Sequence, residues 1–124
     1  MSRFPEIYLD EDGVFHEYHY DEIISKACAM YVAEERNKIS KIKCPLLVEF
    51  KCLRGFAPET RDMQLEFVLK SVSALAYFVD TASAEGQQTK KLLNSFFEIT
   101  PWPIPVKIFF NKDEALAWLM KHKQ

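Results

Sequence analysis

The sequence has 124 residues, of which 48% are hydrophobic and 27% are charged, and only three are glycine. This length and composition predict one folded domain, residues 1–124, and exclude a disordered or fibrous chain. The formal net charge of −2 excludes a general electrostatic attraction to nucleic acid or to anionic membranes.

Neither the first residues nor the cysteines indicate export. No apolar signal segment follows Met1, and no apolar run reaches the length of a membrane span. Cys28, Cys44 and Cys52 are odd in number and form no C-x-x-C pair, so we expect reduced, buried thiols. These features predict a cytoplasmic protein.

Residues 7–20 predict a β-hairpin, because the dipeptide Asp12-Gly13 favours a tight turn and lies between two β-prone runs. Side chains alternate between the faces of a strand, so His16 and His19 should lie on opposite faces. We therefore expect two ordinary, exposed or half-buried histidines that do not share a metal ion.

An amphipathic helix should follow the hairpin. Asp21 stands where a helix N-cap is expected, and apolar residues recur at helical spacing from Ile24 to Val32. The helix should end near Ser40.

The next stretch is a nearly continuous apolar run, residues 46–50, which predicts a strand covered on both faces. Residues 51–58 should form a loop in which Gly55 supplies an unusual backbone angle and Pro58 opens a helix. That helix should span about residues 59–72 and pack an apolar stripe against the sheet.

The second half of the chain repeats the alternation of strand and helix. Buried strands are predicted at residues 74–79 and 106–110, with Ser83 as the cap of the helix between them. The prolines within residues 100–105 exclude a helix there. Asn111, with Glu114 three residues later, predicts the start of a final helix.

The predicted fold class is therefore α/β, in the order β-β-α-β-α-β-α-β-α. Strands that alternate with helices pair in parallel, which applies to residues 46–50, 74–79 and 106–110. We expect a mixed sheet of about five strands, with the hairpin at one edge and helices over at least one face. Ligands and partners of such sheets meet the carboxyl ends of central strands, which directs attention to residues 51–58.

The element order resembles that of a bacterial family of small uncharacterised proteins. The most specific likeness runs from Leu92-Leu-Asn-Ser-Phe-Phe through the Pro-x-Pro-x-Pro segment and Val106-Lys-Ile-Phe-Phe to Glu114-Ala-Leu-Ala-Trp-Leu. That family is grouped by fold with STAS domains, of the anti-sigma-factor antagonist type, and with the CRAL-TRIO lipid-transfer fold. The resemblance implies a STAS-like fold and little about function, because one fold serves many functions.

STAS antagonists carry a serine, in an Asp-Ser-Ser/Thr-Gly type motif, at the start of the helix after the central strand. Phosphorylation there disrupts partner binding, because two added negative charges change the docking surface. The equivalent stretch of this chain is Gly55-Phe-Ala-Pro-Glu-Thr-Arg-Asp, which departs from the motif. Thr60 is its only hydroxyl residue, either a phosphorylation site or an ordinary first-turn residue.

Known catalytic motifs are absent. The chain has no G-x-S-x-G, no glycine-rich phosphate loop, and no histidine next to any cysteine in the sequence. We therefore expect no catalytic residues, no metal site and no cofactor, and we favour a non-catalytic protein over an enzyme. A catalytic group assembled in space from distant residues stays open at this point.

Two interpretations of function remain. The first is a non-catalytic, regulatory STAS-like module that binds a protein partner, with self-association as a homodimer through the edge hairpin. The second is a small carrier of a lipophilic molecule, with a cavity between sheet and helices. The predicted partner- or ligand-binding residues combine the cations and aromatic side chains near the loop at 51–58: Lys51, Arg54, Phe56, Thr60, Arg61, Phe97 and Trp102.

Overall fold

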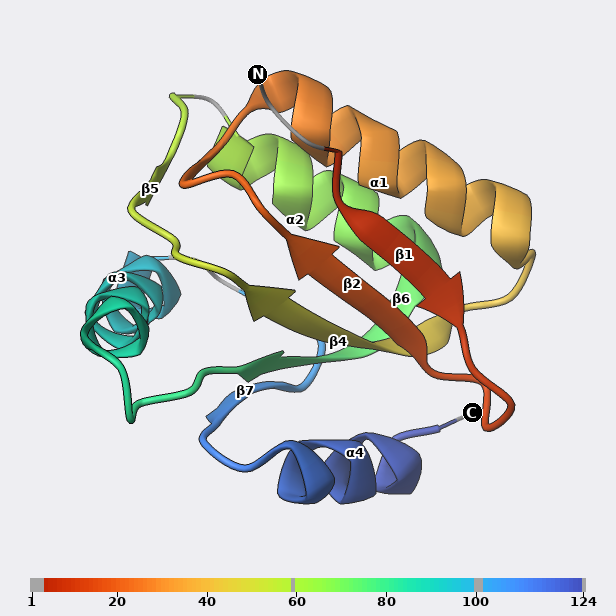
Figure 1. Ribbon diagram of the computed structural model, residues 1–124. Helices are drawn as coiled ribbons and strands as arrows, with labels where there is room; N and C mark the ends of the chain where they lie inside the picture. Colours follow the sequence, from red (N-terminus) through yellow and green to blue (C-terminus); the bar gives the residue numbers. More distant parts are fainter. Residues whose placement is uncertain (1–3, 59, 100–101, 124) are drawn as a thin grey trace.

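A five-stranded mixed sheet forms the centre of the fold (Figure 1). The computed structural model describes residues 4–58, 60–99 and 102–123, with the side chains of residues 61 and 97–99 outside that description. The strands lie in the order β1-β2-β4-β6-β7, and only the pair β1 and β2 is antiparallel. Their bounds are β1 Glu6–Leu9, β2 Phe15–His19, β4 Cys44–Phe50, β6 Val72–Phe78 and β7 Val106–Phe109. The predicted α/β class, the parallel strands and the edge hairpin are thus confirmed.

The turn of the hairpin lies where the sequence predicts it. Gly13 has a φ of 81°, a left-handed conformation that favours glycine. The carboxylate of Asp10 accepts the backbone N–H groups of Asp12 (2.9 Å) and Val14 (3.0 Å). These bonds fix the register in which β1 pairs with β2.

Helices cover both faces of the sheet. They are α1 (Lys26–Ile39), α2 (Thr60–Ser71), α3 (Ala84–Ile99) and α4 (Lys112–Lys121). Cys28 of α1, Val68 of α2 and Leu93 of α3 share one core with the sheet. Ala115 and Leu119 of α4 belong to a second core on the opposite face. Figure 1 shows α1 and α2 side by side on one side of the sheet and α4 on the other.

The alternation of side chains along each strand separates the two cores. In β4, Leu46 and Val48 face α1 and α2, whereas Leu47 between them faces α4. All three are buried. The nearly continuous apolar run in the sequence is therefore explained by cover on both faces.

The start of α1 differs from the prediction, which placed the N-cap at Asp21. Ile23–Ile24 instead forms a short strand, β3, that pairs in parallel with β5 (Gly55–Phe56). The cap is Ser25, whose Oγ accepts the N–H of Cys28 at 3.1 Å. The pairing partner of β3 lies about thirty residues further along the chain, so the local pattern favoured a helix too early.

Two other predictions need correction, the backbone angle of Gly55 and the end of the second helix. Gly55 was expected to supply an unusual backbone angle, but Gly13 is the only glycine in the described residues with a positive φ. Gly55 lies in β5, where a Cβ atom would meet Ile23 at 3.4 Å. The helix predicted to reach residue 72 ends at Ser71, because Val72 already pairs with Cys44 as the first residue of β6.

The caps predicted for the last two helices are confirmed. Ser83 Oγ accepts the N–H of Gly86 at 3.0 Å, and Asn111 Oδ1 accepts the N–H of Glu114 at 3.0 Å. Among the described residues, no helix has both the length and the apolar character that crossing a membrane requires.

Candidate functional site

The predicted cations lie on the surface near the carboxyl end of β4. Lys51 is exposed, and the guanidinium of Arg54 is half exposed and lies 3.5 Å from the carboxylate of Glu22. The backbone of this segment bonds to the chain before α1, since the N–H of Arg54 donates to the carbonyl of Glu22 at 2.7 Å. The loop therefore presents its charged side chains outward on an ordered backbone.

The predicted aromatic residues form part of the core rather than a surface groove. Phe56 and Trp102 are both half-buried and pack against the core that α1, α2 and α3 cover. The ring of Phe96 joins them, with centroids 4.6 Å from Phe56 and 6.3 Å from Trp102. The side chains of Arg61 and Phe97 lie outside the described part of the structure.

Thr60 is fully buried at the start of α2. Its Oγ1 donates a hydrogen bond of 2.6 Å to the carbonyl of Ala57. In this conformation the hydroxyl is accessible to neither a partner nor a kinase, and it orders the first turn of the helix.

The α4 face of the sheet is covered over only part of its width. The side chains of Tyr8, His16, Tyr18 and Tyr20, here called the tyrosine face, surround an open hollow of about 320 Å³ beside the start of α4. Tyr8 stacks on His16 with centroids 4.7 Å apart, and the rings of Tyr18 and Tyr20 are 4.9 Å apart.

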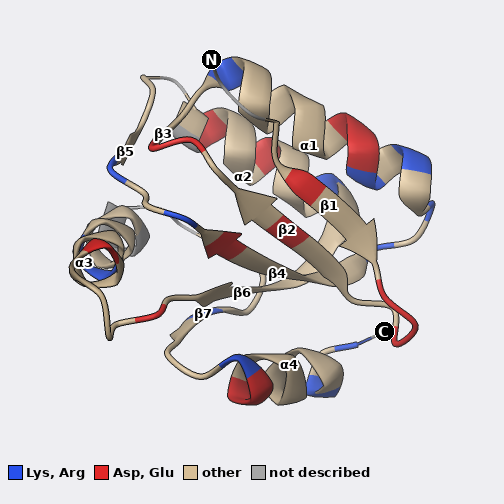
Figure 2. Cartoon of the chain, in the orientation of Figure 1, with Lys and Arg blue, Asp and Glu red and all other residues tan. Residues whose placement is uncertain are grey.

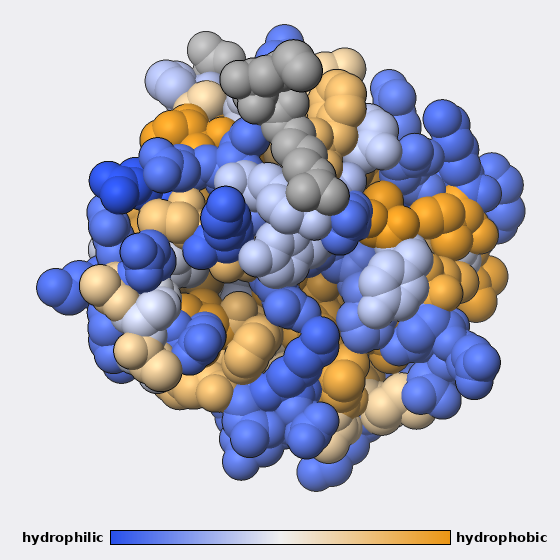
Figure 3. All heavy atoms as spheres, viewed as in Figure 1, coloured by the Kyte–Doolittle hydropathy of each residue, from blue (hydrophilic) through white to orange (hydrophobic). Residues whose placement is uncertain are grey.

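Charged groups on this side of the molecule are mixed in sign. Lys112 of α4 contacts Glu49 of β4, with Nζ and Oε1 2.9 Å apart, at the border of the hollow. Figure 2 shows acidic and basic residues interspersed over helices and loops, and Figure 3 shows hydrophobic surface divided by hydrophilic side chains. In the view of Figure 2, the described charges are mixed in sign and are not gathered in one basic patch.

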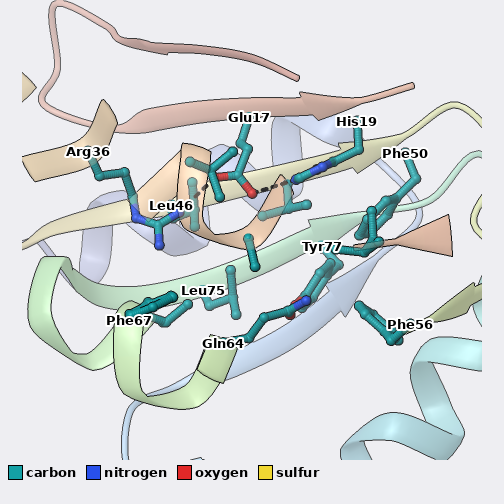
Figure 4. Close-up of a pocket in the computed structure, with 15 residues that line it drawn as sticks. Glu17, His19, Arg36, Leu46, Phe50, Phe56, Gln64, Phe67, Leu75 and Tyr77 are labelled. Atoms are coloured by element: carbon teal, nitrogen blue, oxygen red, sulfur yellow. Dashed lines mark hydrogen bonds and ion pairs between the residues drawn. The ribbon is translucent and has the colours of Figure 1, made fainter. Parts of the chain in front are cut away.

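The opposite face of the sheet contains a continuous series of buried polar groups, which we call the buried polar chain: Cys28, His19, Glu17, Arg36 and Ser71. Cys28 Sγ lies 3.4 Å from His19 Nδ1, and His19 Nε2 lies 2.7 Å from one carboxylate oxygen of Glu17. The other oxygen accepts a hydrogen bond of 2.8 Å from Arg36 Nη1 (Figure 4). Arg36 Nε in turn donates to Ser71 Oγ at 2.9 Å.

Three structural elements position this chain. Glu17 and His19 follow Phe15 along the inner face of β2, at every second residue. Cys28 and Arg36 lie eight residues apart on the buried stripe of α1, and Ser71 is the last residue of α2. The ring of Phe50 stacks on the imidazole of His19, with centroids 5.3 Å apart, and shields it from solvent.

Burial and mutual attraction set the ionisation of the charged members. Burial by itself would raise the pKa of Glu17, but the neighbouring His19 and Arg36 outweigh it and lower that pKa. Burial would likewise lower the pKa of His19, but the carboxylate of Glu17 and the hydrogen bond with Cys28 raise it to about 9. Burial also raises the pKa of the nearby Tyr77 phenol, which therefore stays neutral. At neutral pH the chain combines a carboxylate, an imidazolium and a guanidinium.

A small cavity adjoins the buried polar chain between the sheet and helices α1 and α2. It measures about 30 Å³, enough for one or two water molecules. The polar side chains that line it are those of Glu17, His19, Arg36, Gln64 and Tyr77 (Figure 4). Within the described residues, no group of three or more His, Cys, Asp or Glu side chains is arranged to hold a metal ion.

Sequence reasoning missed the buried polar chain. It expected His19 to be exposed or half-buried, yet the side chain is 5% exposed. The alternation of Phe15, Glu17 and His19, and the helical spacing of Cys28, Val32 and Arg36, placed these residues on apolar faces. The contact between Cys28 and His19 joins two elements, so adjacency in the sequence could not indicate it. The predicted separation of His16 and His19 is confirmed by the burial pattern of β2.

The fold and these sites define a single α/β domain with a mixed five-stranded sheet and four helices. Residues 7–123 match the family described as a domain of unknown function (DUF7793), and the chain belongs to that family. Searches of curated proteins and of solved structures gave no match.

Proposed function

We propose that this protein is a non-catalytic, STAS-like regulatory module of the bacterial cytoplasm that acts through contacts with another protein. The parallel central strands and the element order support the STAS-like part of the proposal. The proposal assigns the contact to the tyrosine face and to the adjoining carboxyl ends of the strands.

The observation that carries the proposal is the open hollow at the tyrosine face. Tyrosine supplies a large contact area at a low cost in conformational entropy, and it is frequent at the energetic centres of protein interfaces. Tyr18 and Glu49 also line a second open hollow, of about 270 Å³, which includes Lys51. Lys51, the first residue of the loop at 51–58, therefore lies beside the tyrosine face.

The alternative, a carrier of a lipophilic molecule, has less support. A cavity for a ligand of that size measures roughly 300 Å³ or more. The space between the sheet and α1 and α2 measures about 30 Å³, and charged side chains form part of its lining. The predicted aromatic residues Phe56 and Trp102 belong to the packed core beside it.

Affinity capture from the native cell tests the proposal. The experiment compares the unaltered protein, the double variant Tyr8→Ala/Tyr18→Ala, and a control, Met30→Ala/Ile42→Ala, that removes exposed apolar side chains elsewhere. We expect one stoichiometric partner, retained by the control and reduced at least about tenfold by the tyrosine variant. Circular dichroism checks that both variants are folded.

Light scattering on the purified chain covers the case in which the partner is a second copy. Edge strand β1 offers a pairing surface for such a homodimer. The proposal fails if capture recovers no stoichiometric partner and the chain is monomeric, or if both variants retain the partner equally.

A further inference from the structure

We propose that Cys28 is a reactive thiol that a small peroxide oxidises to sulfenic acid, with His19 as its proton acceptor and Glu17 as the residue that orients His19. This inference rests on the buried polar chain and is independent of the proposed contact surface.

The geometry is that of an activated nucleophile. Such sites place a nucleophile within reach of a base, and a third group orients the base. Here Sγ of Cys28 lies 3.4 Å from Nδ1 of His19, and Nε2 of the same ring lies 2.7 Å from the carboxylate of Glu17. Arg36 holds the second carboxylate oxygen at 2.8 Å, so the orienting group is itself fixed.

The charges around His19 suit it to hold a proton beside Cys28. The carboxylate of Glu17 overcomes the effect of burial and raises the pKa of His19 to about 9, so its imidazole is a stronger base than that of a free histidine. With His19 protonated, His19 and Arg36 carry two positive charges against the one negative charge of Glu17. A thiolate at Cys28 would balance this excess within a region that water does not screen.

The position of Cys28 on α1 acts in the same direction. The residue lies in the first turn of the helix, and its N–H donates to the capping hydroxyl of Ser25 at 3.1 Å. The amino end of a helix carries partial positive charge, which stabilises a thiolate nearby.

A small cavity lies beside His19. At about 30 Å³ it has room for a molecule of the size of water or hydrogen peroxide, and its lining includes Ala29, the neighbour of Cys28 on α1, but not Cys28 itself. The inference therefore names hydrogen peroxide as the probe.

The reaction balances with hydrogen peroxide as the oxidant. In the reactive form His19 already holds the proton on Nδ1 and Cys28 is the thiolate, whose sulfur attacks one peroxide oxygen. An S–O bond forms as the O–O bond breaks, and the departing hydroxide takes the proton from His19 and leaves as water. The sulfur is oxidised to sulfenic acid and the peroxide is reduced.

The chain contains its own controls, because Cys44 and Cys52 are also buried. Cys44 Sγ contacts the carbonyl of Ile42 and the hydroxyl of Ser40, each at 3.6 Å. Of the three thiols, all in described residues, Cys28 is the one with a hydrogen bond to an imidazole. If burial alone set reactivity, the three would react at similar rates.

The test exposes the full chain to hydrogen peroxide in the presence of dimedone, which traps sulfenic acid, and quantifies each cysteine by mass spectrometry. We expect Cys28 to be labelled at least about tenfold faster than Cys44 and Cys52. His19→Gln should reduce its rate to within about twofold of theirs, and Glu17→Gln should give an intermediate rate. His122→Gln, at the end of α4 on the other side of the sheet, should leave it unchanged.

Two results would overturn the inference. One is labelling of Cys28 no faster than that of Cys44 and Cys52 in the unaltered chain, which requires no variant. The other is an unchanged Cys28 rate in His19→Gln. The rates of Cys44 and Cys52 report unfolding, because loss of the fold would accelerate all three thiols together.

Discussion

Polar side chains are buried on one face of the central sheet and open to solvent on part of the other. The face under α1, α2 and α3 encloses Glu17, His19 and Arg36 almost completely. On the opposite side of the sheet, α4 does not cover the tyrosine face, which stays open to solvent. A helix is about 10 Å wide and neighbouring strands are about 4.8 Å apart, so one helix covers two or three strands. The number of helices on a face therefore decides whether its polar residues become a buried network or a surface.

Mutations on the two faces should also differ in their effect on the free energy of unfolding. Charges buried on the first face depend on one another, because each has lost its hydration and retains only its protein partners. Side chains of the tyrosine face keep part of their contact with water, so altering one of them should cost less. Measurements of stability on variants of the two faces test this contrast.

The largest effect is expected for Arg36→Met. This change keeps much of the apolar stem but leaves one carboxylate oxygen of buried Glu17 without its cationic partner. Removing one partner of a buried pair costs about 3 kcal/mol or more in the free energy of unfolding, measurable by urea denaturation. The double variant Glu17→Gln/Arg36→Met should recover part of this loss, and a fully additive result would contradict the coupling.

The second largest effect is expected in the pH dependence of the free energy of unfolding. The pKa of His19 is raised from 6.5 to about 9 in the folded state, so the folded state retains the proton more strongly. The resulting stabilisation is complete below pH 6.5 and is lost as the pH rises through about 9. The contribution of His19 to the free energy of unfolding at low pH is on the order of 3 kcal/mol.

Urea denaturation at several values between pH 6 and pH 9.5 measures this loss. The variant His19→Gln removes the titrating group and should give a flatter profile over the same range. An identical slope in the two proteins would show that another group is responsible.

A smaller effect is expected for the helix caps, of which one on each face can be compared. Ser25 caps α1 and Asn111 caps α4, each with a side-chain oxygen that accepts one backbone N–H. Replacing either by alanine should cost about 1 kcal/mol in the free energy of unfolding. A much larger loss for Ser25→Ala would indicate that the cap also holds Cys28 in the buried polar chain.

The smallest effect is expected for Tyr8→Ala on the tyrosine face. Tyr8 is 55% exposed, and its ring stacks on that of His16. Its loss should lower the free energy of unfolding by less than about 1 kcal/mol, as measured by urea denaturation. A loss comparable to that of Arg36→Met would mean that this face stabilises the fold and would weaken its assignment as a contact surface.

The sequence by itself determined the α/β class, the hairpin, the parallel strands and two of the helix caps. These features depend on local periodicity, on turn residues such as Gly13, and on capping residues such as Asn111, all of which act over a few positions. The exposed position of Lys51 and Arg54 followed from the same local reasoning.

Only the tertiary structure decided which polar residues meet. Cys28, His19, Arg36 and Ser71 lie on different elements, and their contacts exist because α1 and α2 pack over the inner face of β2. The short strand β3 likewise depends on a partner, β5, about thirty residues away. Local propensity describes what each segment can form alone, whereas long-range packing selects its neighbours, and that selection places the imidazole beside a single thiol.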